Sequence, residues 1–116
     1  AWAHAGVGPG AFSQGGEVPE HLLHLDNFVP HVGLFSATLG ELDSKQAVVF
    51  AHIDVDIYSA ALLVLSSIAC QFFPGTVLVF DELVNYRGFE RSGEFQAWEY
   101  VASSLGISWT YMGMFW

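Results

Sequence analysis

Apolar residues in the second half of the chain form continuous runs of strand length. Val48–Ile53 and Thr76–Phe80 are apolar at nearly every position and rich in β-branched side chains. Continuous rather than alternating apolarity is typical of strands that are covered on both faces, as in parallel sheets. Shorter runs at His31–Phe35 and Ile107–Met112 predict two further strands.

Two helices are expected between these strands. Tyr58–Phe72 has helical length, and Ser59 is its expected N-cap. In Glu94–Leu105 apolar residues recur at three- and four-residue spacing, and Gly106 follows where glycine commonly ends a helix. The alternation of strand and helix predicts an α/β fold with a mainly parallel sheet and flanking helices.

The first part of the chain has a different character. Residues 1–28 are rich in glycine and proline and are predicted to be irregular, apart from a short turn near Glu20–Leu25. Residues 29–116 are predicted to form the strand-and-helix core of one domain, since 116 residues leave room for one at most. The irregular segment is either a functional lid or a terminus without fixed structure, and both interpretations stay open.

Composition and charge exclude several classes of protein. The net charge is −9, and Lys45, Arg87 and Arg91 are the only lysine and arginine residues, too few for a nucleic-acid interface. An acidic surface also disfavours anionic membranes. The uncharged stretch 57–80 is interrupted by Pro74-Gly75 and flanked by acids, so we interpret it as helix, turn and strand rather than a membrane span.

The single cysteine, Cys70, excludes an internal disulfide and is expected to be a buried, inert thiol. The start of the sequence lacks the pattern of a secretory signal, so a reducing, cytoplasmic setting is expected. Charged residues make up only 13% of the chain, against about 25% in ordinary domains. Either the fold exposes an unusual amount of apolar area, or part of that area faces chain that this sequence does not contain.

Acidic residues follow both predicted central strands. Asp54-Val55-Asp56 comes directly after the first, and Asp81-Glu82 after the second. In parallel sheets ligands bind beyond the carboxyl ends of the strands, where neighbouring ends lie about 5 Å apart. Carboxylates that converge there would repel one another unless a cation is bound, and their oxygens suit Mg²⁺, Ca²⁺ or Mn²⁺. The plainer interpretation is that these acids cap helices and start loops.

Three kinds of enzyme place an acid pair after a buried strand. A haloacid-dehalogenase phosphatase fits poorly, because the sequence contains no lysine after Lys45. A D-x-D glycosyltransferase would use Asp54 and Asp56, but would leave Asp81-Glu82 without a role. A catechol-type methyltransferase uses acids at both strand ends.

The stretches HIDVDIYSAALLVL, PGTVLVFDELVNYRGFE and EFQAWEYV resemble the macrocin O-methyltransferase (TylF-like) family of class I methyltransferases. GPGAFSQGGEVP and GLFSATL, nearer the start, are similar to other segments of that family, and the similarity covers nearly the whole chain in the right order. The resemblance implies the C-terminal portion of a Rossmann-like domain that transfers a methyl group from S-adenosyl-L-methionine to a hydroxyl of a small metabolite. It departs from the family at Leu62, Leu63 and Leu83.

Carried over position by position, the resemblance implies that Asp54, Asp81 and Glu82 bind Mg²⁺ or a similar divalent cation, which would lower the pKa of the acceptor hydroxyl and orient it. Asp56 matches the motif as a local hydrogen-bonding residue. His4 lies where a catalytic histidine has been associated with the family. His52, one position before Ile53, is interpreted as a satisfied core histidine.

The Gly-rich turn and ribose-binding acid that would hold the cofactor in such folds do not occur in this sequence, so the N-terminal cofactor-binding half is expected to be missing and the chain inactive alone. Val48–Ile53 would then lack a neighbouring strand, and an open apolar edge favours association. We therefore expect a homo-oligomer or a complementary N-terminal half as partner. The alternative functions are a non-catalytic half-domain that binds or oligomerises and, as a weaker alternative, a D-x-D glycosyltransferase.

Overall fold

The computed structural model describes residues 15–114 of the chain. The chain divides into two compact units, Ala1–Leu42 and Asp43–Trp116. The second unit holds both strands and the two longer helices: β1 (Phe50–Ile53), α2 (Tyr58–Ile68), β2 (Val77–Phe80) and α3 (Gly93–Leu105). Short 3-10 turns follow α2 (η4, Ala69–Gln71) and precede α3 (η5, Phe89–Arg91). The prediction of an α/β fold is confirmed at this level.

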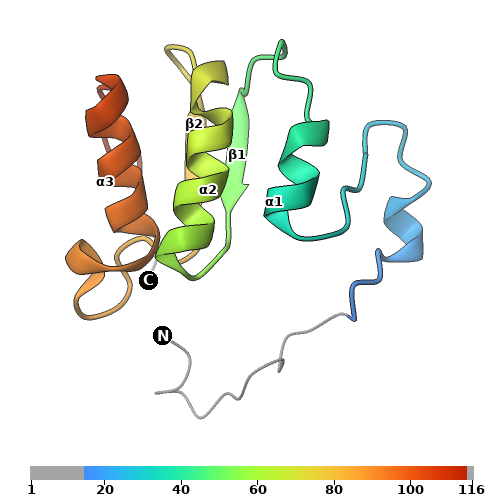
Figure 1. The fold of residues 1–116 in the computed structure, drawn as a ribbon, viewed down its shortest axis with the longest axis horizontal. Helices are drawn as coiled ribbons and strands as arrows, with labels where there is room; N and C mark the ends of the chain where they lie inside the picture. The colour runs from blue at the N-terminus through green and yellow to red at the C-terminus, as the bar shows by residue number, and fades with distance from the viewer. Residues whose placement is uncertain (1–14, 115–116) are drawn as a thin grey trace. The chain divides into compact units, whose positions relative to one another are not determined.

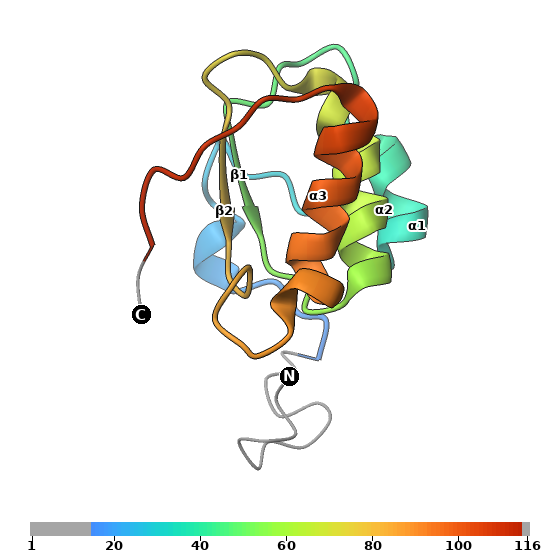
Figure 2. The ribbon, with the colours of Figure 1, turned by 90° about the vertical axis from the view of Figure 1, so that its left-hand side faces the viewer.

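β1 and β2 form a two-stranded parallel sheet, as their continuous apolarity predicts. Phe50 lies opposite Val77, and Ile53 lies opposite Phe80. α2 connects the two strands, and α2 and α3 pack against each other on one face of the sheet (Figures 1 and 2). The carboxyl ends of both strands therefore open at the same edge, where the loops to α2 and α3 begin.

The core lies between this face of the sheet and the two helices. Ile53 from β1, Leu65 from α2 and Trp98 from α3 are buried there, and the Trp98 ring lies 6.1 Å from that of Phe80. The whole cluster of buried apolar residues comprises Ile53, Ala61, Leu65, Ile68, Ala69, Ala97, Trp98, Val101 and Ala102. Small alanines let the helices approach closely, while Trp98 fills the space beneath the sheet.

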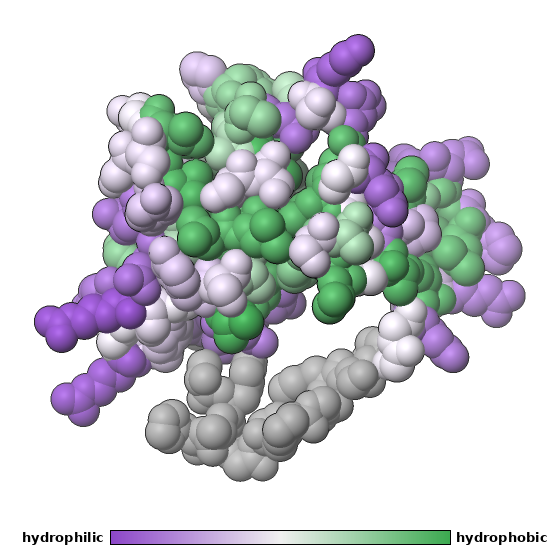
Figure 3. All heavy atoms as spheres, viewed as in Figure 1, coloured by the Kyte–Doolittle hydropathy of each residue, from purple (hydrophilic) through white to green (hydrophobic). Residues whose placement is uncertain are grey.

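Apolar side chains also reach the surface. Leu63 is exposed on α2 and Leu105 on α3, and hydrophobic residues gather over α2 in the space-filling view (Figure 3). α2 is apolar around most of its circumference, because YSAALLVLSSI offers only serines and a tyrosine as polar side chains. Within residues 15–114, none of the helices combines the length and apolarity needed to cross a bilayer.

Two predicted strands are wrong. His31–Phe35 is not a strand in the described structure, because the Leu34 carbonyl accepts the N–H groups of Ala37 and Thr38 and starts the helical turn α1 (Phe35–Thr38) instead. Ile107–Met112 has no regular secondary structure and pairs with no strand within the described residues. Trp109 packs on Trp98 with the ring centroids 5.9 Å apart, so side-chain contact rather than a strand ladder holds this segment.

Helix boundaries agree better with the sequence. α3 ends at Gly106, whose φ of 66° lies in the left-handed region, and the Ile107 N–H donates to the Ala102 carbonyl, as in a glycine-terminated helix. At the start of α2 the N-cap is Ile57 and its side chain makes no capping bond, so the prediction of Ser59 as N-cap is wrong. The helix begins at Tyr58, as predicted, so Ser59 lies inside its first turn.

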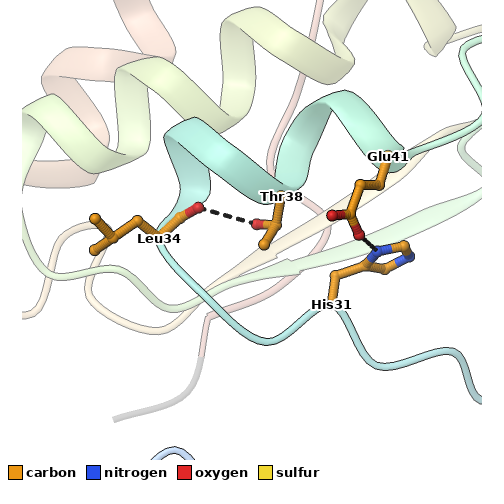
Figure 4. A network of polar contacts seen from close by, with 4 residues as sticks. All are labelled: His31, Leu34, Thr38 and Glu41. Carbon is orange, nitrogen blue, oxygen red and sulfur yellow. Dashed lines mark hydrogen bonds and ion pairs between the residues drawn. The ribbon is translucent and has the colours of Figure 1, made fainter.

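The first unit contains three short turns within its described part: η2 (Glu20–Leu22), α1 and η3 (Leu39–Glu41). η2 confirms the turn expected near Glu20–Leu25. The Thr38 hydroxyl donates to the Leu34 carbonyl at 3.2 Å, and His31 Nδ1 lies 2.6 Å from Glu41 Oε2 (Figure 4). The first contact joins α1 to the residue before it, and the second ties the segment before α1 to the turn η3 after it.

Replacement of Leu65 by alanine tests the core. Leu65 is fully buried between α2, α3 and the sheet, so Leu65→Ala should lower the free energy of unfolding by about 2–5 kcal/mol. Leu63→Ala, on the exposed side of the same helix, should cost less than about 1 kcal/mol. Urea denaturation followed by tryptophan fluorescence measures both, and equal losses would contradict this arrangement of α2.

Candidate functional site

The predicted acids lie at the carboxyl ends of the paired strands. Asp54 follows β1 and Asp81 follows β2, directly after the register partners Ile53 and Phe80. The Asp81 N–H donates to the Ile53 carbonyl at 3.0 Å, so the ladder extends one step past the last paired residues. Asp54 and Asp81 thus occupy neighbouring positions on adjacent strand ends, and both are exposed.

Alternation along the strands explains which acids are exposed and which are buried. Ile53 and Phe80 face the helices, so the following residues, Asp54 and Asp81, continue the outer face of the sheet. One position further, Val55 packs against the core and Glu82 is buried, with only 6% of its surface exposed. The predicted ligands therefore divide into two exposed aspartates and one glutamate turned toward the core.

A third glutamate joins the two strand ends. Glu94, in the first turn of α3, is 1% exposed. Its Oε1 accepts the Val55 N–H at 2.9 Å and its Oε2 accepts the Glu82 N–H at 3.3 Å. Val55 and Glu82 each lie two positions beyond the last residue of their strand. The Glu94 carboxylate therefore bridges equivalent positions in the loops that follow β1 and β2.

The environment of Glu94 acts on its pKa in opposite directions. Burial raises the pKa above its usual value, while hydrogen bonds from the backbone N–H groups of Val55, Glu82 and Asp56 stabilise the ionised form and lower it. The negative charge of Asp54 adds to the raising effect. The net direction is upward, because removal from water outweighs the hydrogen bonds.

The Glu82 carboxylate has fewer hydrogen bonds than that of Glu94 to offset the cost of its burial. Its Oε2 is buried and has no hydrogen-bond partner within the described residues. Burial raises the pKa of this carboxyl, and the charges of Asp56, Asp81 and Glu94 raise it further. A buried, unpartnered carboxylate oxygen beside other acids costs free energy, so this position favours a proton or a bound cation.

The loops around these acids are held in uncommon backbone conformations. Asp56 has φ 59°, in the left-handed region that few residues other than glycine adopt. Gly93 has φ 66°, and a Cβ there would clash with the Tyr86 hydroxyl, which donates to the Ser92 carbonyl at 2.9 Å. Only glycine fits at this position, directly before Glu94.

The structure brings together part of the predicted metal site. Within residues 15–114, no group of three or more His, Cys, Asp or Glu residues is placed so that it could hold one metal ion. Asp54 and Asp81 are neighbours, whereas Glu82 turns toward the core. The metal site therefore stays a prediction. His4 lies outside the described residues.

Two further expectations are wrong. His52 is exposed on the outer face of the sheet rather than in the core, because alternation places it opposite to the buried Ile53. Cys70 is also exposed, since the 3-10 turn η4 directs its neighbour Ala69 into the core instead. A hollow of about 550 Å³ is lined by Arg87, Gly88, Glu90 and Arg91, and none of the predicted ligands borders it.

The sequence interpretation missed the structural role of Glu94. The signal was present in its spacing, because Glu94 precedes Ala97, Trp98 and Val101 by three, four and seven residues and so shares their buried face. An acid on an apolar stripe requires hydrogen-bond partners, and here the partners come from two distant loops. Those partners could not be identified before the loops were placed.

Comparison of the chain with protein-family models, with curated proteins and with solved structures finds no match.

Glu82→Gln tests the cost of the buried carboxylate. Because the pKa of Glu82 is raised by folding, its contribution to stability is full below the pKa of the unfolded chain, about 4.3, and is lost as the pH rises through the folded pKa. Without added cations, Glu82→Gln should therefore raise the free energy of unfolding at pH 7 by about 1 kcal/mol, and by less at pH 4.

Urea denaturation from pH 4 to pH 8 measures this difference. Glu99→Gln, an exposed position on α3, serves as the control and should follow the wild type at every pH. A variant at Glu82 that is less stable than the wild type at pH 7 would contradict the assignment of an uncompensated charge.

Proposed function

We propose that this chain is the metal-binding, C-terminal part of a class I methyltransferase domain of the macrocin O-methyltransferase (TylF-like) type, which methylates a hydroxyl of a small metabolite. The observation that carries the proposal is the pairing of two parallel strands whose ends bear Asp54 and Asp81 in neighbouring positions. The carboxyl edge of a parallel sheet is where α/β folds bind ligands. The sequence resemblance supplies the type of reaction.

The residues at this edge are chemically suited to a divalent cation. Two exposed aspartates would provide oxygen ligands from adjacent strand ends, and the unpartnered Glu82 Oε2 is an acceptor that nothing else in the described residues satisfies. Hard oxygen ligands of this kind suit Mg²⁺ or Mn²⁺. A bound cation would also offset the mutual repulsion of the acids, which the raised pKa of Glu82 reflects.

A cation at this edge would lower the pKa of the acceptor hydroxyl and orient its oxygen toward the methyl group. S-adenosyl-L-methionine, when bound, would supply the methyl group that this oxygen accepts. Asp54, Asp81 and Glu82 would hold the cation, and the family position of the catalytic histidine would be His4. We assign no cofactor-binding residue, because the Gly-rich turn does not occur in this sequence.

Titration with Mn²⁺ tests the metal site directly. Isothermal calorimetry should detect binding to the wild-type chain, and Asp54→Asn or Asp81→Asn should each weaken it at least about tenfold, because each removes a charged ligand. Glu99→Gln removes one negative charge at an exposed position of α3 and should leave the affinity unchanged. Equal weakening in all three variants would indicate nonspecific attraction to an acidic protein, and no binding to the wild type would refute the metal proposal.

A second function is favoured by the outer face of the sheet. Phe50 and Val79 lie there with 60% and 42% of their surfaces exposed, although strand residues of this type are usually covered. A sheet of two strands also has two edges at which another strand can pair. These features fit a non-catalytic module that associates with a second copy of the chain.

Charged substitutions on this face test self-association. The wild-type chain should elute from size-exclusion chromatography above its monomer mass, and Phe50→Lys combined with Val79→Lys should shift it toward the monomer, because lysine on an edge strand opposes pairing. Leu105→Lys, an equally apolar and exposed position at the end of α3, is the control and should not change elution. A wild-type monomer with cooperative unfolding would exclude the association function.

A further inference from the structure

We propose that the turn between β2 and α3 is a binding site for a phosphate group carried by a small molecule, held by Arg87 and Arg91. Both arginines line the hollow of about 550 Å³, together with Gly88 and Glu90. None of the acids at the strand ends borders this hollow. The inference therefore goes beyond the metal-binding function proposed above and does not depend on it.

The cationic side chains of this chain are unevenly distributed. Twelve acidic residues are accompanied by only three lysine and arginine residues, and two of these three are Arg87 and Arg91, in one five-residue segment. Neither guanidinium group forms a hydrogen bond or an ion pair with another described residue. Both arginines are exposed, so a ligand can reach them from solvent. An anion is thus the partner that their charges lack.

Hydrogen bonds fix the backbone that carries the two arginines. The Tyr86 hydroxyl donates to the Ser92 carbonyl at 2.9 Å, so the residues directly before and after segment 87–91 are joined to each other. Within the segment, the Arg91 N–H donates to the Gly88 carbonyl at 3.1 Å. Gly88 has φ 87°, in the left-handed region that glycine favours, and this lets the chain reverse direction between the arginines. The segment is therefore a closed turn.

An aromatic contact attaches this turn to α3. The Phe89 ring meets the Phe95 ring edge to face, with the centroids 5.1 Å apart and an angle of 88° between the planes. Phe95 lies in the first turn of α3, and the turn folds back beside the start of this helix (Figures 1 and 2). Such contacts stabilise a fixed arrangement. The backbone of both arginines is held before a ligand arrives, which lowers the entropy cost of binding.

Two guanidinium groups on one turn suit a phosphate group better than a carboxylate. A phosphomonoester carries about 1.5 to 2 negative charges at pH 7 and three strong acceptor oxygens, so it can engage both arginines at once. A carboxylate has a single charge, which one arginine satisfies through its planar fork of N–H donors. The hollow also has the volume of a small-molecule site, for which about 300–1,000 Å³ is usual. It therefore has room for the group that carries the phosphate.

Titration of the full chain with inorganic phosphate, at constant ionic strength, tests the site. The side-chain Nε–H signals of the arginines are followed by NMR, because Arg87 and Arg91 are the only arginines in the chain and each variant assigns the other signal. Both signals should shift in the wild type. Arg87→Gln and Arg91→Gln should each weaken binding at least about tenfold, because each removes a charge-assisted pair of hydrogen bonds.

Lys45→Gln is the matched control. Lys45 is the remaining cation of the lysine and arginine set and lies at an exposed position outside the turn. Its loss should leave phosphate affinity within about twofold of the wild type, because salt screens a distant surface charge. Glu90→Gln should instead strengthen binding by about twofold, because it removes the acidic charge that lines the hollow.

Two further probes test the chemical class of the ligand. Methyl phosphate, the smallest phosphomonoester, should bind within about threefold of inorganic phosphate, since it keeps the oxygens that the arginines contact. Acetate should bind at least about tenfold more weakly, because it carries a single charge. Rejection of methyl phosphate, or acetate binding as tight as that of phosphate, would overturn the assignment of a phosphate group on a small molecule.

The remaining outcomes decide whether the site exists. Shifts of both arginine signals, lost in the two arginine variants and kept in Lys45→Gln, would support it. Equal weakening in Lys45→Gln would reduce the effect to general attraction between anions and cations and overturn the site. An absence of shifts in the wild type would overturn it as well, and this measurement needs no variant to fold.

Discussion

The burial of one carboxylate, that of Glu94, constrains the acidic end of this structure. Removing a carboxylate from water is costly, and backbone N–H groups from Val55 and Glu82 offset that cost by donating to it. The two N–H groups belong to loops that are 27 residues apart in sequence, so the charge can be satisfied only when both loops and α3 are in place. The free energy of burying Glu94 thus couples the ends of β1 and β2 to the helix that packs beneath them.

The sheet and helices set the direction in which the acids face. α2 and α3 cover one side of the strand pair, so residues alternate between a buried row and an exposed row up to and beyond the strand ends. Asp54 and Asp81 fall in the exposed row, and Glu82 falls in the buried one. The Asp54 and Asp81 carboxylates are therefore accessible to a ligand. Glu82 follows Asp81 directly, but its carboxylate lies in a less polar environment.

Burial of the Glu82 carboxylate lowers the stability of the fold but leaves an oxygen that a ligand could bind. A buried oxygen without a partner lowers stability, and a ligand that supplied the missing partner would recover that free energy. The uncommon conformations of Asp56 and Gly93 lie in the same two loops. The left-handed backbone of Asp56 and the unpartnered Glu82 oxygen therefore lie at the same edge of the sheet, at its carboxyl end.

Local sequence was sufficient for the parallel strand pair, for α3 with its terminus at Gly106, and for the placement of acids after both strands. These features depend on apolar runs, helical spacing and glycine conformation, which act over a few residues. Features that depend on residues distant in sequence, such as strand pairing and long-range hydrogen bonds, were decided by the tertiary structure. His31–Phe35 and Ile107–Met112 have strand-like composition but no neighbouring strand to pair with in the described residues. Glu94 became a bridge only because the folded chain brings two backbone N–H groups to its carboxylate, and a hydrogen bond across 12 or 39 residues leaves no local pattern in sequence.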